Sequence, residues 1–242
     1  MQTQLKLITG AGPRWPCLAL LAGVILVLDG CATARAPFKT EAKPRTRPAS
    51  TEAAATIPLS QATIELEGRP VTGWRETDFA GRGDVRVEKD RILLQLGYMT
   101  GITWTNAFPK MDYEVNLDAM RVEGNDFFCG LTFPVGESPC SFIVGGWGGG
   151  VVGLSSIDGE DAANNETTKY LNFEKGRWYH IRLRVTQGTI ECWIDDEKVV
   201  NVDTTGHTLS IRSEVEPSKP FGIATWSTTG AVKAIKVTRV KK

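Results

Sequence analysis

The sequence has 242 residues, of which 41% are hydrophobic and 23% charged, with 28 basic and 28 acidic side chains. Residues 1–60 hold seven of the basic and three of the acidic residues, so the remainder has 21 and 25 and is acidic overall. A domain that binds nucleic acid needs a basic surface, so nucleic acid is not expected as a partner. About 180 residues after position 60 suffice for one well-buried domain and are too few for two.

The first thirty residues have the pattern of an export signal. Basic residues at Lys6 and Arg14 precede an apolar run from Cys17 to Leu28. A run of about a dozen apolar residues is short for a membrane span, which needs roughly twenty. We therefore predict a signal peptide over residues 1–30.

The end of this segment, Leu28-Asp29-Gly30-Cys31, resembles the lipobox of bacterial lipoproteins, although Asp29 replaces the usual small or apolar residue. The resemblance implies that Cys31 becomes a lipidated N-terminus and holds the chain on a membrane. Without an acidic residue after the cysteine, the outer membrane is the expected destination. The alternative is ordinary secretion with cleavage after Ala34, so the protein is expected in the cell envelope, either anchored to the outer membrane or periplasmic or extracellular.

Residues 31–60 are predicted to be a disordered tether. From residue 35 onward they are rich in Ala, Pro, Thr, Lys and Arg and contain one aromatic residue, Phe38. Such a segment buries too little apolar surface to offset the entropy of ordering. The folded domain is expected over residues 61–242.

Almost every periodic segment of this domain alternates with a period of two, which is typical of β-strands. No segment after the signal peptide favours a helix. Short alternating strands separated by turns predict an all-β fold, an antiparallel two-sheet β-sandwich of jelly-roll type. The span from Pro70 to Asp90 is rich in Gly and charge and indicates a loop. The expected strands are Arg91–Leu96, Tyr113–Met120, Asp126–Phe133, Ser141–Trp147, Val151–Ser155, Lys169–Phe173, Arg177–Thr186, Thr189–Ile194, Val199–Val202, Gly222–Ser227 and Val232–Val240.

The most informative segment is a β-hairpin from Arg177 to Val202, with Gln187-Gly188 as its turn. Folding on that turn sets Val185 opposite Ile190 and continues the apolar pairing along one face. The opposite face pairs Arg184 with Glu191, Arg182 with Trp193, and His180 with Asp195.

The pattern W-Y-x-I-x-L-x-V, a short turn and I-x-C-W-I-D-D resembles the late hairpin of the concanavalin A-like lectin and glucanase superfamily, which includes laminin-G-like domains. Over about residues 74–240 the chain is also similar to the 3-keto-disaccharide hydrolase domain family. That family's central strand carries a Glu-x-Gln-like pattern followed by an acidic residue, whereas residues 141–147 here read S-F-I-V-G-G-W. For this reason no catalytic residue is transferred from the family.

One face of the strand Tyr113–Met120 is expected to be polar, with Glu114, Asn116 and Asp118 in a row. In a jelly roll such a row could bind sugar hydroxyls or supply an acid and a base to a glycosidic centre. The alternative is an ordinary solvated outer face. We assign Glu114 and Asp118 as candidate catalytic residues and Asn116 as a candidate substrate-binding residue.

The polar face of the hairpin adds three further candidates. His180 could titrate near neutral pH and act in catalysis, and Trp193 could stack on a sugar ring beside Arg182. The structural alternative is that these groups satisfy one another, with Arg182 in a cation–π contact over Trp193 and His180 paired with Asp195.

Two glycine-rich or acidic stretches could also contact ligands. Trp147 lies among five glycines, where a ligand can approach the backbone, and is assigned as a candidate substrate-binding residue. The loop over residues 158–167 concentrates oxygen ligands, so calcium could bind there, or the loop could simply be solvated. No other cofactor is expected.

The domain holds three cysteines, Cys129, Cys140 and Cys192. Cys129 and Cys192 fall on apolar faces and are expected to be buried thiols. A four-residue turn over 136–139 would set Cys140 opposite Val135 and leave Cys129 too distant for a disulfide.

These patterns predict an exported, carbohydrate-active domain with a carbohydrate ligand, and the family resemblance implies hydrolysis of 3-keto-glycosides. A non-catalytic carbohydrate-binding module and a laminin-G-like protein-interaction module are the alternatives. The oligomeric state is not predicted.

Overall fold

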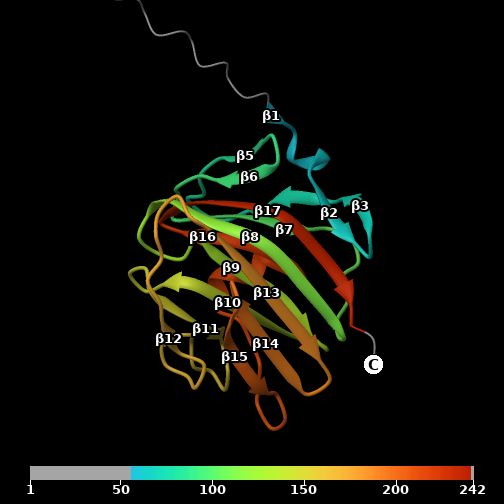
Figure 1. The fold of residues 1–242 in the computed structure, drawn as a ribbon, viewed down its shortest axis with the longest axis vertical. Coiled ribbons are helices and arrows are strands. Elements are labelled where there is room, and N and C mark those ends of the chain that lie inside the picture. The colour runs from blue at the N-terminus through green and yellow to red at the C-terminus, as the bar shows by residue number, and fades with distance from the viewer. Residues whose placement is uncertain (1–55, 241–242) are drawn as a thin grey trace, which may run out of the picture. The chain divides into compact units, whose positions relative to one another are not determined.

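The computed structural model describes residues 56–240, which form two stacked β-sheets (Figure 1). The predicted signal peptide, Cys31 and the predicted tether up to residue 55 lie outside the described residues. Pairing is antiparallel except between β17 and β2. The predicted all-β sandwich of jelly-roll type is confirmed.

The first sheet has ten strands, with β1, β5, β6, β17, β8, β13, β14 and β15 in order; β2 also pairs with β17, and β3 pairs with β2. Their bounds are β1 Thr56–Ile57, β2 Thr63–Leu66, β3 Arg69–Thr72, β5 Val85–Glu88, β6 Arg91–Leu94, β8 Tyr113–Gly124, β13 Trp178–Thr186, β14 Thr189–Ile194, β15 Glu197–Asp203 and β17 Thr228–Arg239.

The second sheet has seven strands in the order β12, β11, β10, β9, β16, β7 and β4. Their bounds are β4 Trp74–Glu76, β7 Met99–Trp104, β9 Cys129–Val135, β10 Ser138–Gly146, β11 Val151–Ser155, β12 Lys169–Tyr170 and β16 Phe221–Trp226. The described range also contains two short 3-10 helices, η1 Leu59–Gln61 and η2 Ser213–Ser218. Neither of these two helices has the length and apolar character needed to cross a membrane.

The core lies between the sheets and follows the alternation of the strands. On β8 the side chains of Tyr113, Val115 and Leu117 are buried, while the residues between them are partly exposed. Trp104 and Trp74 meet edge to face at 5.3 Å between ring centroids. Burying large apolar side chains of this kind stabilises the sandwich by about 1.5–3 kcal/mol each.

The hairpin of β13 and β14 has the predicted register. Val185 pairs with Ile190, Leu183 with Cys192, and the outward pair is Arg182 with Trp193. The guanidinium of Arg182 lies 3.8 Å from the ring centroid of Trp193, so the expected cation–π contact is also present.

The hairpin of β9 and β10 departs from the prediction. Its turn is shorter than expected, with Val135 paired to Ser138 and Phe133 paired to Cys140. Gly136 adopts a positive φ of 62°, which permits a turn of two residues in place of four. All three cysteines of the domain are buried free thiols.

Strands also occur where the sequence indicated loop or tether. The span expected to be a loop contains most of β3 and all of β4 and β5. Strand β1 begins at Thr56, inside the predicted tether, and pairs with β5.

Candidate functional site

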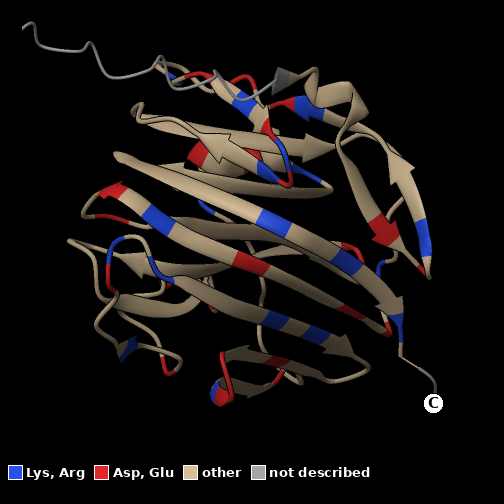
Figure 2. Ribbon diagram, turned by 45° about the horizontal axis from the view of Figure 1, so that its top comes forward, with Lys and Arg blue, Asp and Glu red and all other residues tan. Residues whose placement is uncertain are grey.

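The outward face of the ten-stranded sheet brings together six of the seven predicted catalytic and substrate-binding residues. The pairing of β13 with β8 sets His180 beside Asp118 and Arg182 beside Asn116, and the pairing with β14 adds Trp193. Figure 2 shows basic and acidic residues alternating over the strands of this sheet.

These side chains are engaged with one another. Glu114 accepts a hydrogen bond from Arg184 Nε at 2.8 Å and another from the Asn116 amide at 3.0 Å. The imidazole Nδ1 of His180 lies 3.0 Å from Asp118 Oδ1. The carboxylate that faces the imidazole is therefore Asp118.

The predicted pairing of His180 with Asp195 takes a different form. Asp195 has a positive φ of 53° at the end of the hairpin, and its Oδ1 accepts the backbone N–H of His180 at 2.9 Å. Its other oxygen pairs with Arg177 at 2.8 Å. The Asp195 carboxylate therefore binds the backbone of His180 and the side chain of Arg177, and it does not pair with the His180 imidazole.

Trp193 is only 7% exposed, which limits its use as a stacking platform. Arg182 covers it at 3.8 Å and Lys198 lies 5.0 Å from the ring centroid. A sugar would have to displace these cations to reach the indole face. The proposed roles of the residues on this sheet stay predictions.

Trp147 lies apart from that group, in the turn after β10 on the seven-stranded sheet. The two tryptophans assigned as candidate substrate-binding residues, Trp147 and Trp193, are therefore positioned by different sheets. Trp147 is 43% exposed and has a positive φ of 48°.

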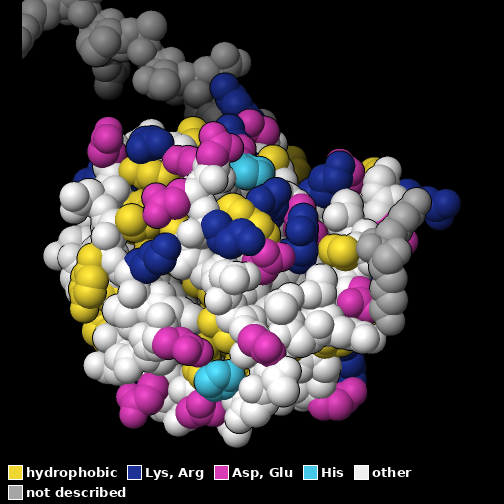
Figure 3. Space-filling model, turned by 60° about the horizontal axis from the view of Figure 1, so that its bottom comes forward, with side chains coloured by type: hydrophobic (Ala, Val, Ile, Leu, Met, Phe, Trp, Pro, Cys, Tyr) yellow, Lys and Arg dark blue, Asp and Glu magenta, His cyan; other side chains and the backbone are white. Residues whose placement is uncertain are grey.

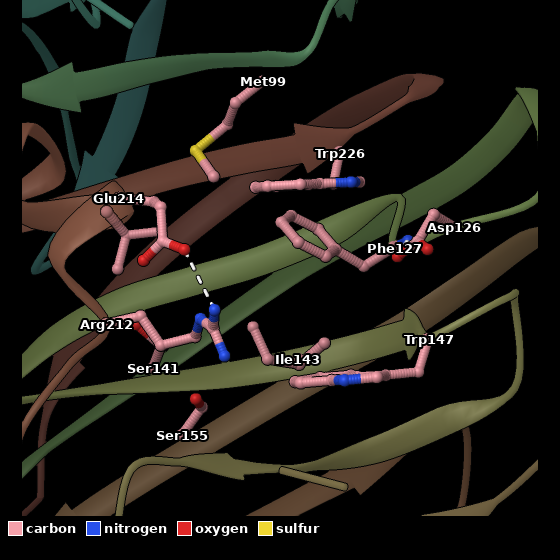
Figure 4. A pocket seen from close by; sticks show the side chains of 11 residues that line it. Met99, Asp126, Phe127, Ser141, Ile143, Trp147, Ser155, Arg212, Glu214 and Trp226 are labelled. Carbon is pink, nitrogen blue, oxygen red and sulfur yellow. Dashed lines mark hydrogen bonds and ion pairs between the residues drawn. The ribbon is translucent and has the colours of Figure 1, made fainter. Parts of the chain in front are cut away.

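A cavity of about 260 Å³ lies over the outward face of the seven-stranded sheet (Figure 4). Its lining residues come from the strands and from the loops between them: Met99, Asp126, Phe127, Ser141, Ile143, Trp147, Ser155, Arg212, Glu214, Val215 and Trp226.

Aromatic side chains form the walls of this cavity. The indoles of Trp147 and Trp226 lie on opposite sides of it, with Phe127 between them at one end (Figure 4). Outside the lining, the ring of Tyr98 packs against Trp226 at 4.3 Å between centroids. Facing aromatic planes are suited to a flat, partly apolar ligand such as a sugar ring.

A buried arginine positions the turn that carries Trp147. Arg121 is 5% exposed, and its Nη2 donates to the carbonyls of Asp126, Gly145 and Gly149 at 3.1, 3.0 and 2.8 Å. A Cβ on Gly145 would lie 2.4 Å from that nitrogen, so the turn requires glycine there. Burial lowers the pKa of Arg121, yet arginine stays charged because its ordinary pKa is so high.

Asp126 braces the same turn from the cavity side. Its carboxylate accepts the backbone N–H of Phe127 at 2.8 Å and that of Gly148 at 3.1 Å. Both oxygens of Asp126 therefore accept backbone hydrogen bonds. The wall formed by Phe127 and Trp147 is held by Asp126 on the cavity side and by Arg121 on the buried side.

The other end of the cavity carries a guanidinium and a carboxylate. Arg212 donates to Glu214 at 2.9 Å and to Asp161 at 3.1 Å. The hydrogen bond from Arg212 lowers the pKa of Glu214, which is therefore ionised at neutral pH. The lining contains two carboxylates, those of Asp126 and Glu214. Asp126 binds the backbone of the turn, whereas Glu214 faces the cavity and does not hold a turn.

Two hydroxyl residues, Ser141 and Ser155, line the floor between these two ends. The strand pairing sets Thr132, Ser141 and Ser155 in one row across β9, β10 and β11. Thr132 and Ser141 hydrogen-bond each other at 3.0 Å. Ser155 Oγ is buried and has no hydrogen-bond partner.

Several oxygens of the acidic loop over residues 158–167 already have partners within the loop or on neighbouring residues. Asn165 donates to the carbonyls of Leu154 and Asp161 and accepts from Thr167. Asp158 accepts from His207 Nδ1 at 2.7 Å. Within residues 56–240, no group of three or more His, Cys, Asp or Glu side chains is arranged to hold a metal ion.

Sequence reasoning missed most of the cavity. Trp226 and Phe127 are aromatic residues within predicted strands. Placing them on the outward face of the sheet, beside Trp147, would have indicated an aromatic site there. Arg212 and Glu214 lie at the start of the short 3-10 helix η2, whose sequence has no periodicity, so nothing in the sequence placed them over the sheet.

Over residues 63–238 the chain matches the model of the 3-keto-alpha-glucoside-1,2-lyase-like domain. No curated protein sequence gives a significant match. The fold is similar to carbohydrate binding module CBM66 from Bacillus subtilis, with 14% identity, a TM-score of 0.45, and coverage of 72% of this chain and 98% of that one. It is also similar to a beta-1,3-glucanase from Mycobacterium marinum, with 9% identity, a TM-score of 0.47, and coverage of 69% and 91%. A protein with a galectin-like fold from Bacillus subtilis has 11% identity, a TM-score of 0.46, and coverage of 70% and 90%.

Proposed function

Because the chain belongs to the 3-keto-alpha-glucoside-1,2-lyase-like domain family, we propose that it binds a 3-keto-glucoside in the cavity between Trp147 and Trp226 and cleaves its glycosidic bond. The observation that carries the proposal is the arrangement of two opposed indoles with a carboxylate at the end of the same cavity (Figure 4). Indole faces pack against the C–H faces of a sugar ring, and the polar groups fix its orientation.

The chemistry follows from the ketone. A carbonyl at C3 makes the hydrogen on C2 acidic, so a carboxylate can remove that proton. The electron pair then forms a C1–C2 double bond, the C1–O bond breaks, and the leaving oxygen takes up a proton. Water adds to the double bond afterwards and yields the free keto sugar. We assign the base to Glu214, which is ionised and faces the cavity.

The catalytic set predicted from the sequence, Glu114, Asp118 and His180, is a second proposal. The register supports it by placing the three side chains on adjacent strands. The two assignments can be compared with matched variants, because Glu114 and Glu214 are both glutamates that accept a hydrogen bond from an arginine.

The test uses purified protein and 3-keto-sucrose, with release of monosaccharide as the measurement. Glu214→Gln should lower kcat by about 100-fold or more, as expected for loss of a general base, while Glu114→Gln stays near the wild-type rate. The reverse result would move catalysis to the ten-stranded sheet. Wild-type protein that releases no sugar across the pH range would refute the enzymatic proposal.

A non-catalytic carbohydrate-binding module is a further candidate function. The favouring observation is that the central strand β10 offers Ser141 and Ile143 to the cavity floor, and neither is a carboxylate. Binding of a 3-keto-glucoside without any turnover, weakened by Trp226→Ala, would establish this role in place of the enzymatic one.

Export and lipidation are also proposed, on the sequence of residues 1–31. Cys31→Ser should release the protein from the membrane fraction into the soluble fraction of the envelope. If the variant stays with the membrane, Cys31 is not the anchor.

A further inference from the structure

The cavity contains one polar group that the protein leaves unsatisfied. Ser155 is 2% exposed, and its hydroxyl has no hydrogen-bond partner although it belongs to the cavity lining. In Figure 4 this hydroxyl points from the floor toward the side chain of Arg212. A buried hydroxyl without a partner destabilises the folded state, so its presence calls for an acceptor that the chain itself does not supply.

The neighbouring hydroxyls on the same row do have partners. Thr132 and Ser141 bond to each other, two strands and one strand away from Ser155. Within this row of three hydroxyls, the unsatisfied one is therefore the one at the cavity position next to Arg212.

The Arg212 side chain can turn toward the Ser155 hydroxyl. Its side chain is 48% exposed, and its ion pairs with Asp161 and Glu214 are near the surface. Exposed ion pairs contribute little to stability, so a ligand can exchange one of them at small cost. A ligand oxygen entering between the two side chains would then receive a hydroxyl donor and a guanidinium donor.

We propose that Ser155 and Arg212 bind the ketone oxygen at C3 of the substrate and thereby make the site selective for the keto sugar over its parent glycoside. This inference rests on the proposed function. A carbonyl oxygen accepts two hydrogen bonds and brings no hydrogen of its own that would need a partner. When the proton leaves C2, negative charge develops on this oxygen, and the two donors stabilise it most at that stage.

The arrangement also prepares the base. Arg212 lowers the pKa of Glu214 while the two side chains are bonded. When Arg212 turns toward the ketone, that bond weakens and the Glu214 carboxylate becomes a stronger base. Substrate binding would thus activate Glu214 at the moment when the C2 proton must be removed.

The test compares Ser155→Ala with Thr132→Val, which removes a hydroxyl that has a partner and does not line the cavity. Binding of 3-keto-glucosides and of the parent glucosides is measured by calorimetry, kcat by sugar release, and stability by thermal unfolding. Ser155→Ala should unfold at the same or a higher temperature than the wild type, because it removes an unsatisfied polar group. It should reduce the preference for the keto sugar about tenfold or more and lower kcat by about 100-fold.

Thr132→Val should lower the unfolding temperature and keep the keto preference of the wild type. If Ser155→Ala leaves both the preference and kcat unchanged while the wild type cleaves its substrate, the inference is wrong and the proposed function stands. If the wild type neither binds nor cleaves 3-keto-glucosides, both are wrong.

Discussion

Replacing Arg121 with methionine tests whether one buried guanidinium holds the wall of the cavity. Methionine keeps the apolar stem, which can still pack on Phe128 and Phe173, whose ring centroids lie 5.0 and 5.7 Å from the guanidinium. Methionine removes the guanidinium N–H groups through which Arg121 binds the carbonyls of the turn around Trp147. The variant therefore separates hydrogen bonding from packing.

The structure sets the size of the effect. Nη2 carries two hydrogens and lies 3.1, 3.0 and 2.8 Å from three carbonyl oxygens, so it can form two good hydrogen bonds at a time. A hydrogen bond from a charged donor contributes about 1.5–3 kcal/mol. Relief from burying the charge offsets part of this loss, which leaves an expected destabilisation of about 2–4 kcal/mol. Affinity for the sugar should fall about tenfold or more, because Trp147 is no longer held in place.

Urea unfolding followed by circular dichroism measures the stability, and a double-mutant cycle with Gly145→Ala checks the cause. In the wild type, alanine at 145 would place its Cβ 2.4 Å from Arg121 Nη2 and would also strain a φ of +79°. In the Arg121→Met background this clash is absent, and the backbone strain of about 1 kcal/mol remains together with tight contacts to Phe128 at 3.1 Å and the Gly149 carbonyl at 3.2 Å. A cost for Arg121→Met below about 1 kcal/mol, or equal costs for Gly145→Ala in both backgrounds, would refute this account.

Three further outcomes are expected. Trp147→Ala and Trp226→Ala should each weaken sugar binding about tenfold or more in calorimetry, and unchanged affinity in both would remove the aromatic walls from the site. The hydrogen bond to Asp158 raises the pKa of His207, so this histidine contributes stability below about pH 6.5 that is lost as pH rises through its folded pKa. His207→Gln should therefore unfold at a lower temperature than the wild type at about pH 5 and at a similar one at about pH 9, and a difference independent of pH would contradict this. The three buried thiols of the domain should resist alkylation in the native protein and react after unfolding, as mapped by mass spectrometry, because burial raises their pKa values.

Strands with one buried and one polar face could be predicted from the sequence. β8 and the hairpin of β13 and β14 alternate cleanly, because their outward side chains meet solvent. That alternation fixes both the register and the face on which each residue lies. The same regularity led us to assign Glu114 and His180 to a site.

The cavity could not be predicted because its strands do not alternate. All six residues of β7 are buried, since the core covers one face and side chains such as those of Val215 and Trp226 cover the other. A polar residue such as Ser155 on a doubly buried strand gives no periodic signal. The segment of Arg212 and Glu214 reaches the sheet only through tertiary packing, which no local pattern encodes.

On the face shown in Figure 3, acidic and basic side chains are mixed in the upper half, and acidic side chains predominate in the lower half. The charged residues of the cavity lining are two carboxylates, Asp126 and Glu214, and one guanidinium, Arg212. A neutral ligand suits these surroundings better than a uronic acid or a sulfated sugar, whose charge would face the carboxylates.

The placement of the tryptophans gives the protein a built-in optical probe. Trp74 and Trp104 are enclosed in the core, and Trp193 lies beneath cations, whereas Trp147 is 43% exposed and lines the cavity. Because water stabilises the excited state of indole, Trp147 should contribute strongly to the long-wavelength part of the tryptophan fluorescence, together with the partly exposed Trp178 and Trp226. A ligand that fills the cavity would shift that emission to shorter wavelength, so sugars could be screened without labels.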